Sequence, residues 1–186
     1  MKNALLSLVV LALVAIVPVR AAEQPGMNQN PMAARTAVHQ EAMKKLEFLA
    51  GTWKGKAWYS MGPNRKHEVE QTETVQIKQQ GVVLLVEGLG RDASSGAIVH
   101  DAMGVLSYDD VSKTYRLTSW AGAGRSGVFD ASVGSNRLEW GMKNESGTIR
   151  YTLVINEKGE WFEIGERSSD GATWIKFCEM TLQKVQ

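Results

Sequence analysis

The sequence predicts an all-β protein: an antiparallel up-and-down β-barrel of about ten strands, preceded by one short α-helix. After Gly51, short segments rich in β-branched and aromatic residues recur at regular spacing, with turn-type residues between them. All four prolines lie at or before Pro63, so every later residue can donate a backbone hydrogen bond to a sheet. Closing such a sheet removes its exposed edges. A β-sandwich is the alternative architecture.

The composition is that of an ordinary globular protein. The 186 residues are 44% hydrophobic and 22% charged, which excludes disordered, collagen-like and fibrous classes. A net charge of +1 provides no field for nucleic acid, so no nucleic-acid partner is expected. One cysteine, Cys178, excludes an internal disulfide and any multi-cysteine metal site. We expect its thiol to be buried as a small apolar group.

The first segment, residues 1–21, is predicted to be a cleavable signal peptide. Lys2 is followed by an apolar run from 4 to 17, by Pro18, and by the small or branched residues Val19 and Ala21 at the −3 and −1 positions. The apolar run is shorter than the roughly 20 residues needed to cross a bilayer. The sequence therefore predicts a periplasmic or secreted protein with no membrane span after cleavage.

Residues 22–35 are predicted to be a flexible linker, because they are rich in proline, glycine and asparagine and poor in apolar residues. A single β-barrel domain is expected to occupy residues 36–186. Thr36 is the expected cap of the short helix, which is predicted to stop before Gly51. Its apolar face is predicted from helical spacing to comprise Val38, Ala42, Met43, Leu46 and Leu49.

Ten strands are predicted after the helix, and the alternation and the turn residues set their bounds. They are residues 53–59, 68–78, 82–91, 98–108, 115–121, 127–133, 137–142, 148–156, 161–167 and 174–182.

Gly51-Thr52-Trp53, after a short helix and at the start of the first strand, resembles the opening of the lipocalins and of the wider calycin group. In that group the tryptophan lies across the closed end of the barrel. The stretches 85–88, 100–109, 161–166, 173–174 and 179–182 resemble a group of exported bacterial barrel proteins classed as a domain of unknown function. This resemblance covers nearly all of residues 46–185 and implies a calycin-like barrel.

Two further implications follow from the resemblance. Lipocalins place a cation from the last strand on the tryptophan, and Lys176 or Lys184 would serve here. Nitrobindin-like barrels open similarly and hold haem through a histidine near the C-terminus. Here the histidines are His39, His67 and His100, so that ligand is not carried over and no cofactor is expected.

The six tryptophans all fall within or at the edge of predicted strands, and Trp53, Trp120 and Trp140 are candidate ligand-binding residues. Aromatic rings that line a barrel hold a flat or apolar ligand, whereas packed cross-strand pairs merely fill a core. Either role is open for each tryptophan.

Glu87 and Glu179 are the candidate polar anchors. Glu87 alternates with Leu85 and Leu89 in a segment that is apolar on both faces, so we expect its carboxylate to be buried and paired. Arg116 and Arg150 are the expected counter-charges. A structural ion pair, an anchor for a ligand head group and a catalytic acid are three alternative roles. Which strand face points inward is open, because one bulge reverses it.

Catalytic and metal motifs are scarce. His100 and Asp101 are adjacent in a predicted strand and point to opposite faces, so they form no dyad, although His100 remains a candidate ligand contact. The three histidines are scattered along the chain, so no metal site is expected. Neither Gly-x-Ser-x-Gly nor a phosphate-binding Gly-rich loop with Lys is present. We therefore predict no metal and no catalytic residue.

The hypothesis favoured by the sequence is an exported barrel that binds a small hydrophobic or amphipathic ligand in its interior. The alternatives are a packed structural or interaction barrel, and an isomerase or hydrolase that uses a buried carboxyl group.

Overall fold

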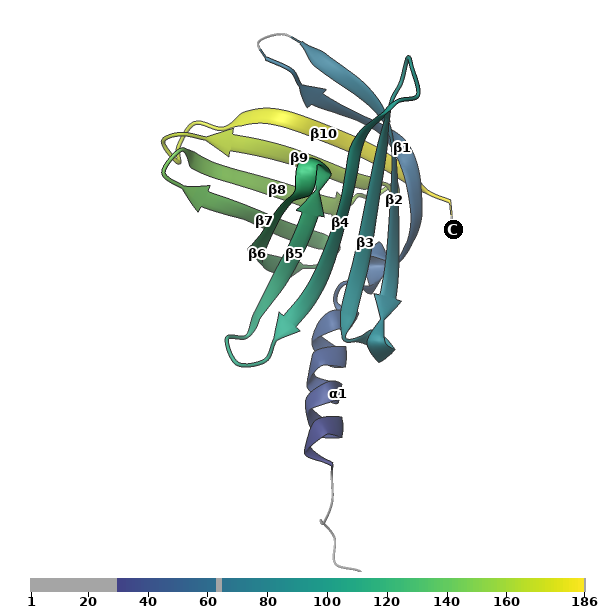
Figure 1. The fold of residues 1–186 in the computed structure, drawn as a ribbon. Coiled ribbons are helices and arrows are strands. Elements are labelled where there is room, and N and C mark those ends of the chain that lie inside the picture. The colour runs from purple at the N-terminus through teal and green to yellow at the C-terminus, as the bar shows by residue number, and fades with distance from the viewer. Residues whose placement is uncertain (1–29, 63–64, 186) are drawn as a thin grey trace, which may run out of the picture.

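A computed structural model of the chain describes residues 30–62 and 65–185. It is a closed antiparallel barrel of ten strands in which each strand pairs with its neighbours in sequence (Figure 1). The pairing of β1 with β10 closes the sheet. The predicted up-and-down barrel is confirmed, and the alternative β-sandwich is wrong.

The strands match the predicted segments, with ends that differ by about two residues at most. Their bounds are β1 Gly51–Ser60, β2 Lys66–Lys78, β3 Val83–Asp92, β4 Ile98–Asp109, β5 Thr114–Ala121, β6 Arg125–Gly134, β7 Arg137–Asn144, β8 Gly147–Ile155, β9 Trp161–Ser168 and β10 Ile175–Lys184. Short 3₁₀ turns follow β2 (η2, Gln79–Gly81) and β5 (η3, Gly122–Gly124).

The helix α1 spans Pro31–Lys44 and begins earlier than predicted. Asn30 caps it, since its Oδ1 accepts a hydrogen bond from the Met32 amide at 3.1 Å, and Pro31 suits the first helical position. The prediction that Thr36 is the cap is wrong, because Thr36 lies inside the helix and bonds the Met32 carbonyl. Residues 31–35 of the predicted linker are therefore helical. Residues 22–29 and the predicted signal peptide lie outside the described residues.

The C-terminal part of α1 covers one end of the barrel, and its outer part extends away from the strands (Figure 1). A 3₁₀ turn, η1 (Glu47–Leu49), joins it to β1. Met43, Leu46 and Leu49 are buried in the core, but Val38 is 46% exposed, so the predicted apolar face is only partly used. None of the helices in the described part of the chain is long and apolar enough to span a membrane.

Polar contacts hold α1 against the barrel. The Arg35 guanidinium donates two hydrogen bonds of 2.8 Å to the Asp110 carboxylate in the β4–β5 turn. The Tyr115 hydroxyl on β5 donates to the Ala42 carbonyl at 2.8 Å. We call the end that α1 covers the near end and the opposite end the far end.

The near end is filled by apolar side chains. Trp53 is 2% exposed, donates from Nε1 to the Leu49 carbonyl at 2.8 Å, and meets Trp161 edge to face at 5.7 Å. This is the position across the closed end that the resemblance implies. Around the two tryptophans the core contains Val75, Leu84, Leu106, Leu117, Leu138, Leu153 and Leu182.

Alternate burial shows which side chains point inward. On β2 the buried residues are Val69, Gln71, Glu73 and Val75, and the residues between them are more exposed. On β9 the alternation runs through Trp161, Glu163 and Gly165, and Ser168 at the end of the strand is also buried. The apolar near end thus gives way to polar side chains toward the far end, within the same inward-facing rows.

Candidate functional site

Glu73 is a buried carboxyl group in the barrel interior. It is 5% exposed and accepts a hydrogen bond of 2.7 Å on Oε1 from the Nε2 of Gln71, two residues earlier on β2. Burial and the nearby charge of Glu163 raise the pKa of Glu73 to about 8, despite the opposing effect of the bond from Gln71. The group is therefore largely protonated at neutral pH.

Glu163 on β9 is the second buried carboxyl group. It is 8% exposed, and its Oε2 accepts a hydrogen bond of 3.0 Å from the Trp161 Nε1. Burial raises the pKa of Glu163 to about 7, although the bond from Trp161 favours the charged form. The barrel interior thus contains two carboxyl groups whose pKa values lie near 7 and 8.

Glycines on β3 make room for the polar side chains of β2. Gly88 pairs with Glu73, and Gly90 pairs with Gln71. A Cβ atom on Gly88 would lie 2.8 Å from Oε1 of Glu73, and one on Gly90 would lie 2.6 Å from Oε1 of Gln71. Both distances are shorter than a Cβ atom normally approaches, so the end of the Glu73 or Gln71 side chain would have to move. The side chains of Gln71 and Glu73 therefore lie over a strip of bare backbone.

Three weaker acids lie close to Glu163. Tyr59 pairs with Cys178, Cys178 with Gly165, and Gly165 with Tyr151, so these residues follow one line across β1, β10, β9 and β8. Burial raises the pKa of both tyrosines and raises that of Cys178 to about 12, and in each case the charge of Glu163 adds to the effect. Glu163 lies two residues from Gly165 on the same inward-facing row of β9, which places it beside this line. The interior cluster comprises Tyr59, Glu73, Tyr151, Glu163 and Cys178.

Aromatic rings continue this wall. Tyr151 stacks on Trp140 with ring centroids 4.0 Å apart, and it meets Phe177 edge to face at 5.6 Å. Tyr59 stacks on His100 at 5.9 Å. Trp140, Tyr151 and His100 are only partly buried although they lie on inward-facing positions. Solvent thus reaches the far half of the interior, in contrast to the near end.

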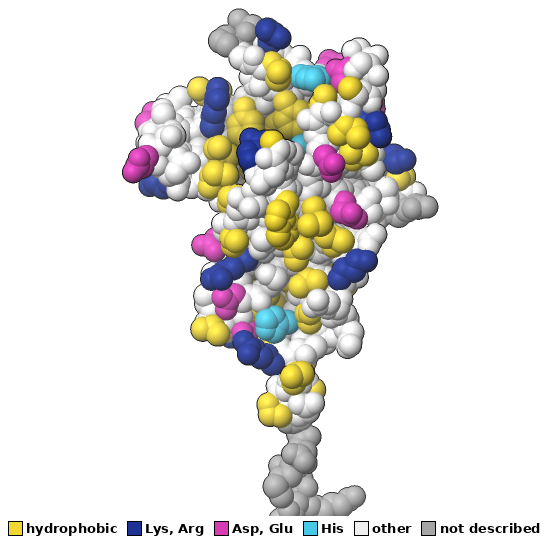
Figure 2. Space-filling model, in the orientation of Figure 1, with side chains coloured by type: hydrophobic (Ala, Val, Ile, Leu, Met, Phe, Trp, Pro, Cys, Tyr) yellow, Lys and Arg dark blue, Asp and Glu magenta, His cyan; other side chains and the backbone are white. Residues whose placement is uncertain are grey.

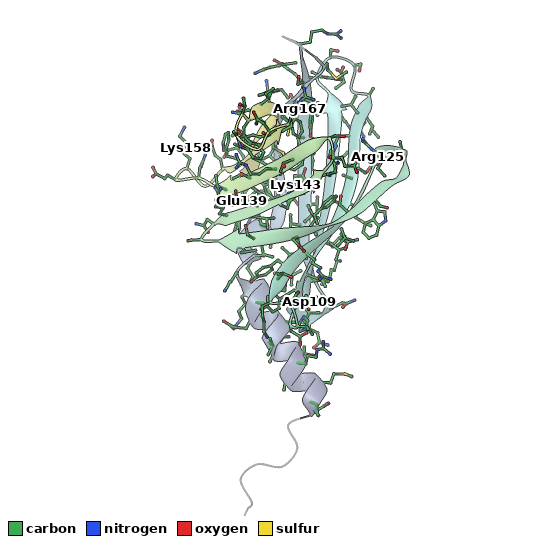
Figure 3. The ribbon with its side chains drawn as sticks, turned by 90° about the vertical axis from the view of Figure 1, so that its left-hand side faces the viewer. Asp109, Arg125, Glu139, Lys143, Lys158 and Arg167 are labelled. Atoms are coloured by element: carbon green, nitrogen blue, oxygen red, sulfur yellow. The ribbon has the colours of Figure 1, made fainter. Side chains whose placement is uncertain are left out.

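The described residues 30–62 and 65–185 place no Lys, Arg or His within ion-pair distance of Glu73 or Glu163, since each ion pair there involves other acids. The same part of the chain contains no group of three or more His, Cys, Asp or Glu side chains arranged to hold a metal. Arg125 and Arg167 lie toward the far end, whereas Asp109 lies near α1 (Figure 3). Both arginines are exposed.

This arrangement has two chemical capacities. Protonated carboxyl groups donate and accept hydrogen bonds in an apolar setting, which is how a barrel orients a bound molecule. Carboxyl groups with pKa values near 7 also exchange protons at neutral pH, which is the property of general acids and bases.

Of the eight residues predicted from the sequence, three point inward. Trp53 lies in the near-end core and packs against other core side chains. Trp140 stacks on Tyr151 and His100 stacks on Tyr59, so both lie beside the interior cluster. The cation on Trp53 comes from Lys184, whose Nζ lies 5.2 Å from the ring centroid, whereas Lys176 pairs with Glu179 at 2.6 Å.

The other five lie on the outer surface. The expected burial of Glu87 is wrong: it is exposed on the outer face of β3, and Leu85 and Leu89 share that face. Arg116 pairs with Asp109 at 3.2 Å rather than with Glu87.

Arg150 also pairs with an acid other than Glu87 and Glu179, the partners expected from the sequence. It donates to Glu166 at 2.7 Å and lies over the Trp174 ring at 3.9 Å. Glu179 lines a groove of about 330 Å³ outside β1, β2 and β10, together with Trp58 and Lys66. The predicted counter-charges therefore neutralise outer acids.

Trp120 is 42% exposed and belongs to an apolar patch on the outside of the barrel. It pairs with Met103 on β4, and Val128 on β6 is also exposed nearby in the sheet. Apolar side chains gather over β3, β4 and β5 near the middle of Figure 2. Such a patch is the feature on which the interaction-barrel alternative depends.

Sequence reasoning missed Gln71, Glu73, Tyr59, Tyr151 and Glu163. The available signal was their spacing: Glu163 is two residues from Trp161, and Glu73 alternates with Val69 and Val75. Had Trp53 been assigned to the interior, the pairing of β1 with β2 would have shown that Gln71 and Glu73 also face inward.

No family model matches this chain, and none of the curated proteins matches it significantly. Among solved structures, 17 chains match, and one is Rv2717c from M. tuberculosis. Its TM-score is 0.58 at 15% sequence identity, over 78% of this chain and 98% of that one. The likeness is one of fold. Membership of the lipocalins or of the nitrobindin-like barrels therefore stays a resemblance of local motifs.

Proposed function

We propose that this protein is an exported barrel that binds a small amphipathic molecule in the far half of its interior. The observation that carries the proposal is the pair of buried carboxyl groups, Glu73 and Glu163, whose side chains point into the barrel interior. A protein that only needed a packed core would gain more from apolar side chains at these positions. Polar groups among aromatic rings are typical of ligand sites.

Barrel size supports the same proposal. Eight strands already enclose enough space for one small ligand, and ten strands give a wider barrel. Several inward positions beyond the apolar core carry small residues, among them Ala57, Ala102 and Ser119.

The test is native mass spectrometry of the purified protein, followed by organic extraction and analysis of any bound molecule. Ser119→Phe narrows the interior, and Thr118→Phe places the same ring on the outer face as a matched control. We expect a bound mass that persists in the control and disappears in Ser119→Phe. A folded parent protein that binds neither an endogenous molecule nor a fluorescent apolar probe contradicts the proposal.

Export is part of this proposal, and it is supported by the leader-like residues 1–21. Expression of the whole chain in a Gram-negative host, with N-terminal sequencing of the periplasmic fraction, tests it. A mature N-terminus at Ala22 or Glu23 is expected, and an unprocessed cytoplasmic product contradicts it.

A second candidate function is acid–base catalysis by the same two groups. It is favoured by the pKa of Glu163, which lies near 7. The two functions are distinguished by turnover: an enzyme converts the extracted molecule, and a carrier returns it unchanged.

A further inference from the structure

The two interior carboxyl groups have no charged partner. Among residues 30–62 and 65–185, the cations that form ion pairs do so with other acids, such as Glu166 and Asp110, and not with these two. An unpaired buried carboxylate costs free energy, and protonation of Glu73 and Glu163 in the free protein avoids this cost. A cation brought in by a ligand would satisfy them directly.

An unused acceptor lies next to them. Gln71 is 1% exposed, and its Nε2 donates to Glu73, but its Oε1 is buried without a hydrogen-bond donor. A buried acceptor left without a donor costs about 1–3 kcal/mol, and native structures contain few of them. The backbone of Gly90 gives it space in place of a side chain. Gln71 therefore offers a second kind of acceptor beside the acids.

Apart from Arg125, the other titratable groups of the described residues that face the cluster are uncharged or favour the uncharged form. Tyr59 from β1, Tyr151 from β8 and Cys178 from β10 are neutral at pH 7, and burial raises their pKa values further. Burial lowers the pKa of His100 from β4, which favours its neutral form. Arg125 from β6 is exposed at the far end, and its charge acts on the hydroxyl of Tyr151 (Figure 3).

We propose that the interior ligand is a small primary ammonium compound with an apolar body, an inference that rests on the proposed interior binding. Its –NH₃⁺ group has three donors, which match the carboxyl groups of Glu73 and Glu163 and the free Oε1 of Gln71. Its apolar body contacts the rings of Tyr151 and Trp140, which also attract cations.

Binding of such a cation is coupled to proton release. In the free protein at pH 7 Glu73 is largely protonated, and Glu163, with a pKa of about 7, is partly protonated. On entry of the ammonium group, a carboxyl group that still holds its proton becomes a carboxylate, and that proton passes to solvent. The complex then contains one N–H···carboxylate ion pair in place of an O–H group. Affinity is therefore expected to rise with pH between about pH 6 and about pH 8, where the amine stays charged.

The experiment is isothermal titration calorimetry of the purified protein with three probes of equal size: benzylammonium, benzyl alcohol and benzoate. We expect benzylammonium to bind at least about tenfold more tightly than benzyl alcohol, and benzoate to bind most weakly. Titrations in two buffers of different ionisation enthalpy measure the proton released, which we expect for benzylammonium alone.

Three variants separate the cluster from the rest of the barrel. Glu73→Gln and Glu163→Gln keep the side-chain shape, and each is expected to weaken benzylammonium binding about tenfold or more. Glu87→Gln removes an exposed acid from the outer face of β3 and is expected to leave binding unchanged. Circular dichroism establishes that each variant is folded.

The outcomes are distinguishable. Equal binding of benzylammonium and benzyl alcohol, or benzylammonium binding that survives both Glu→Gln substitutions, overturns the cation inference. In the first case interior binding of a neutral ligand stands if Ser119→Phe abolishes it. Absence of binding by all three probes and by an apolar fluorophore overturns the proposed function as well.

Discussion

Gly88 lies directly opposite Glu73 across the β2–β3 pair, and a Cβ atom at Gly88 would come within 2.8 Å of Oε1 and 2.9 Å of Oε2 of that carboxyl group. The glycine thus provides the space in which a buried acid is held. Because the conflicting atoms belong to one side chain, removing that side chain should remove the conflict.

We therefore predict that Gly88→Ala destabilises the protein by about 1–3 kcal/mol in the parent and by clearly less in a Glu73→Ala background. Urea denaturation of the four members of this double-mutant cycle measures the coupling. Additive effects would show that the Ala methyl group meets no resistance from Glu73.

Stability is predicted to depend on pH through both interior acids. The pKa values of Glu73 and Glu163 are raised from 4.5, so the folded state binds more protons than the unfolded state above about that pH. Their contribution is fully present below about pH 4.5 and is lost as the pH rises through about 7 and 8.

Glu73→Gln and Glu163→Gln should consequently match the parent near pH 4 and exceed its stability at about pH 9 by several kcal/mol. The free energy of unfolding, measured in urea across this range, checks the prediction. The matched substitution Glu87→Gln, on the outer face, should leave the slope unchanged. Parallel pH profiles for the parent and both interior variants would contradict it.

The near end is predicted to be the most sensitive part of the barrel. Trp53→Phe loses the hydrogen bond from Nε1 to the Leu49 carbonyl and part of the contact with Trp161. We expect a loss of about 2–3 kcal/mol. Trp120→Phe, at a 42% exposed position, is the control and should cost less than about 0.5 kcal/mol. Equal losses would mean that Trp53 does not seal the core.

Cys178 is predicted to be unreactive in the folded protein. Its side chain is 7% exposed, and burial together with the charge of Glu163 raises the pKa of its thiol to about 12. Ellman's reagent should label it in urea and only at the rate of unfolding in buffer. Rapid stoichiometric labelling of the native protein would place the thiol at the surface.

The strands were predictable from the sequence because turn residues bound each of them within a long proline-free tract. Which face of each strand points inward was not predictable from the sequence. Leu85 and Leu89 are apolar residues on the outer face of β3, and they made Glu87 look buried. Pairing registers, which are long-range, decided that Glu73 rather than Glu87 faces inward.

The helix start shows a similar limit. Thr36 is a good cap by residue type, but Asn30-Pro31 offers both a cap and a preferred first residue, and the contact of Arg35 with Asp110 adds a tertiary reason to extend α1. That contact joins residues 75 positions apart, so local pattern alone does not reveal it.

The most direct test of the buried acid pair is a carbon-13 NMR titration of the glutamate side-chain carboxyl groups, with signals assigned through Glu73→Gln and Glu163→Gln. We predict two carboxyl groups that titrate well above the rest, at about pH 8 for Glu73 and about pH 7 for Glu163. Titration of every glutamate near pH 4.5 would contradict the account, because neither acid would then be held in a water-poor interior.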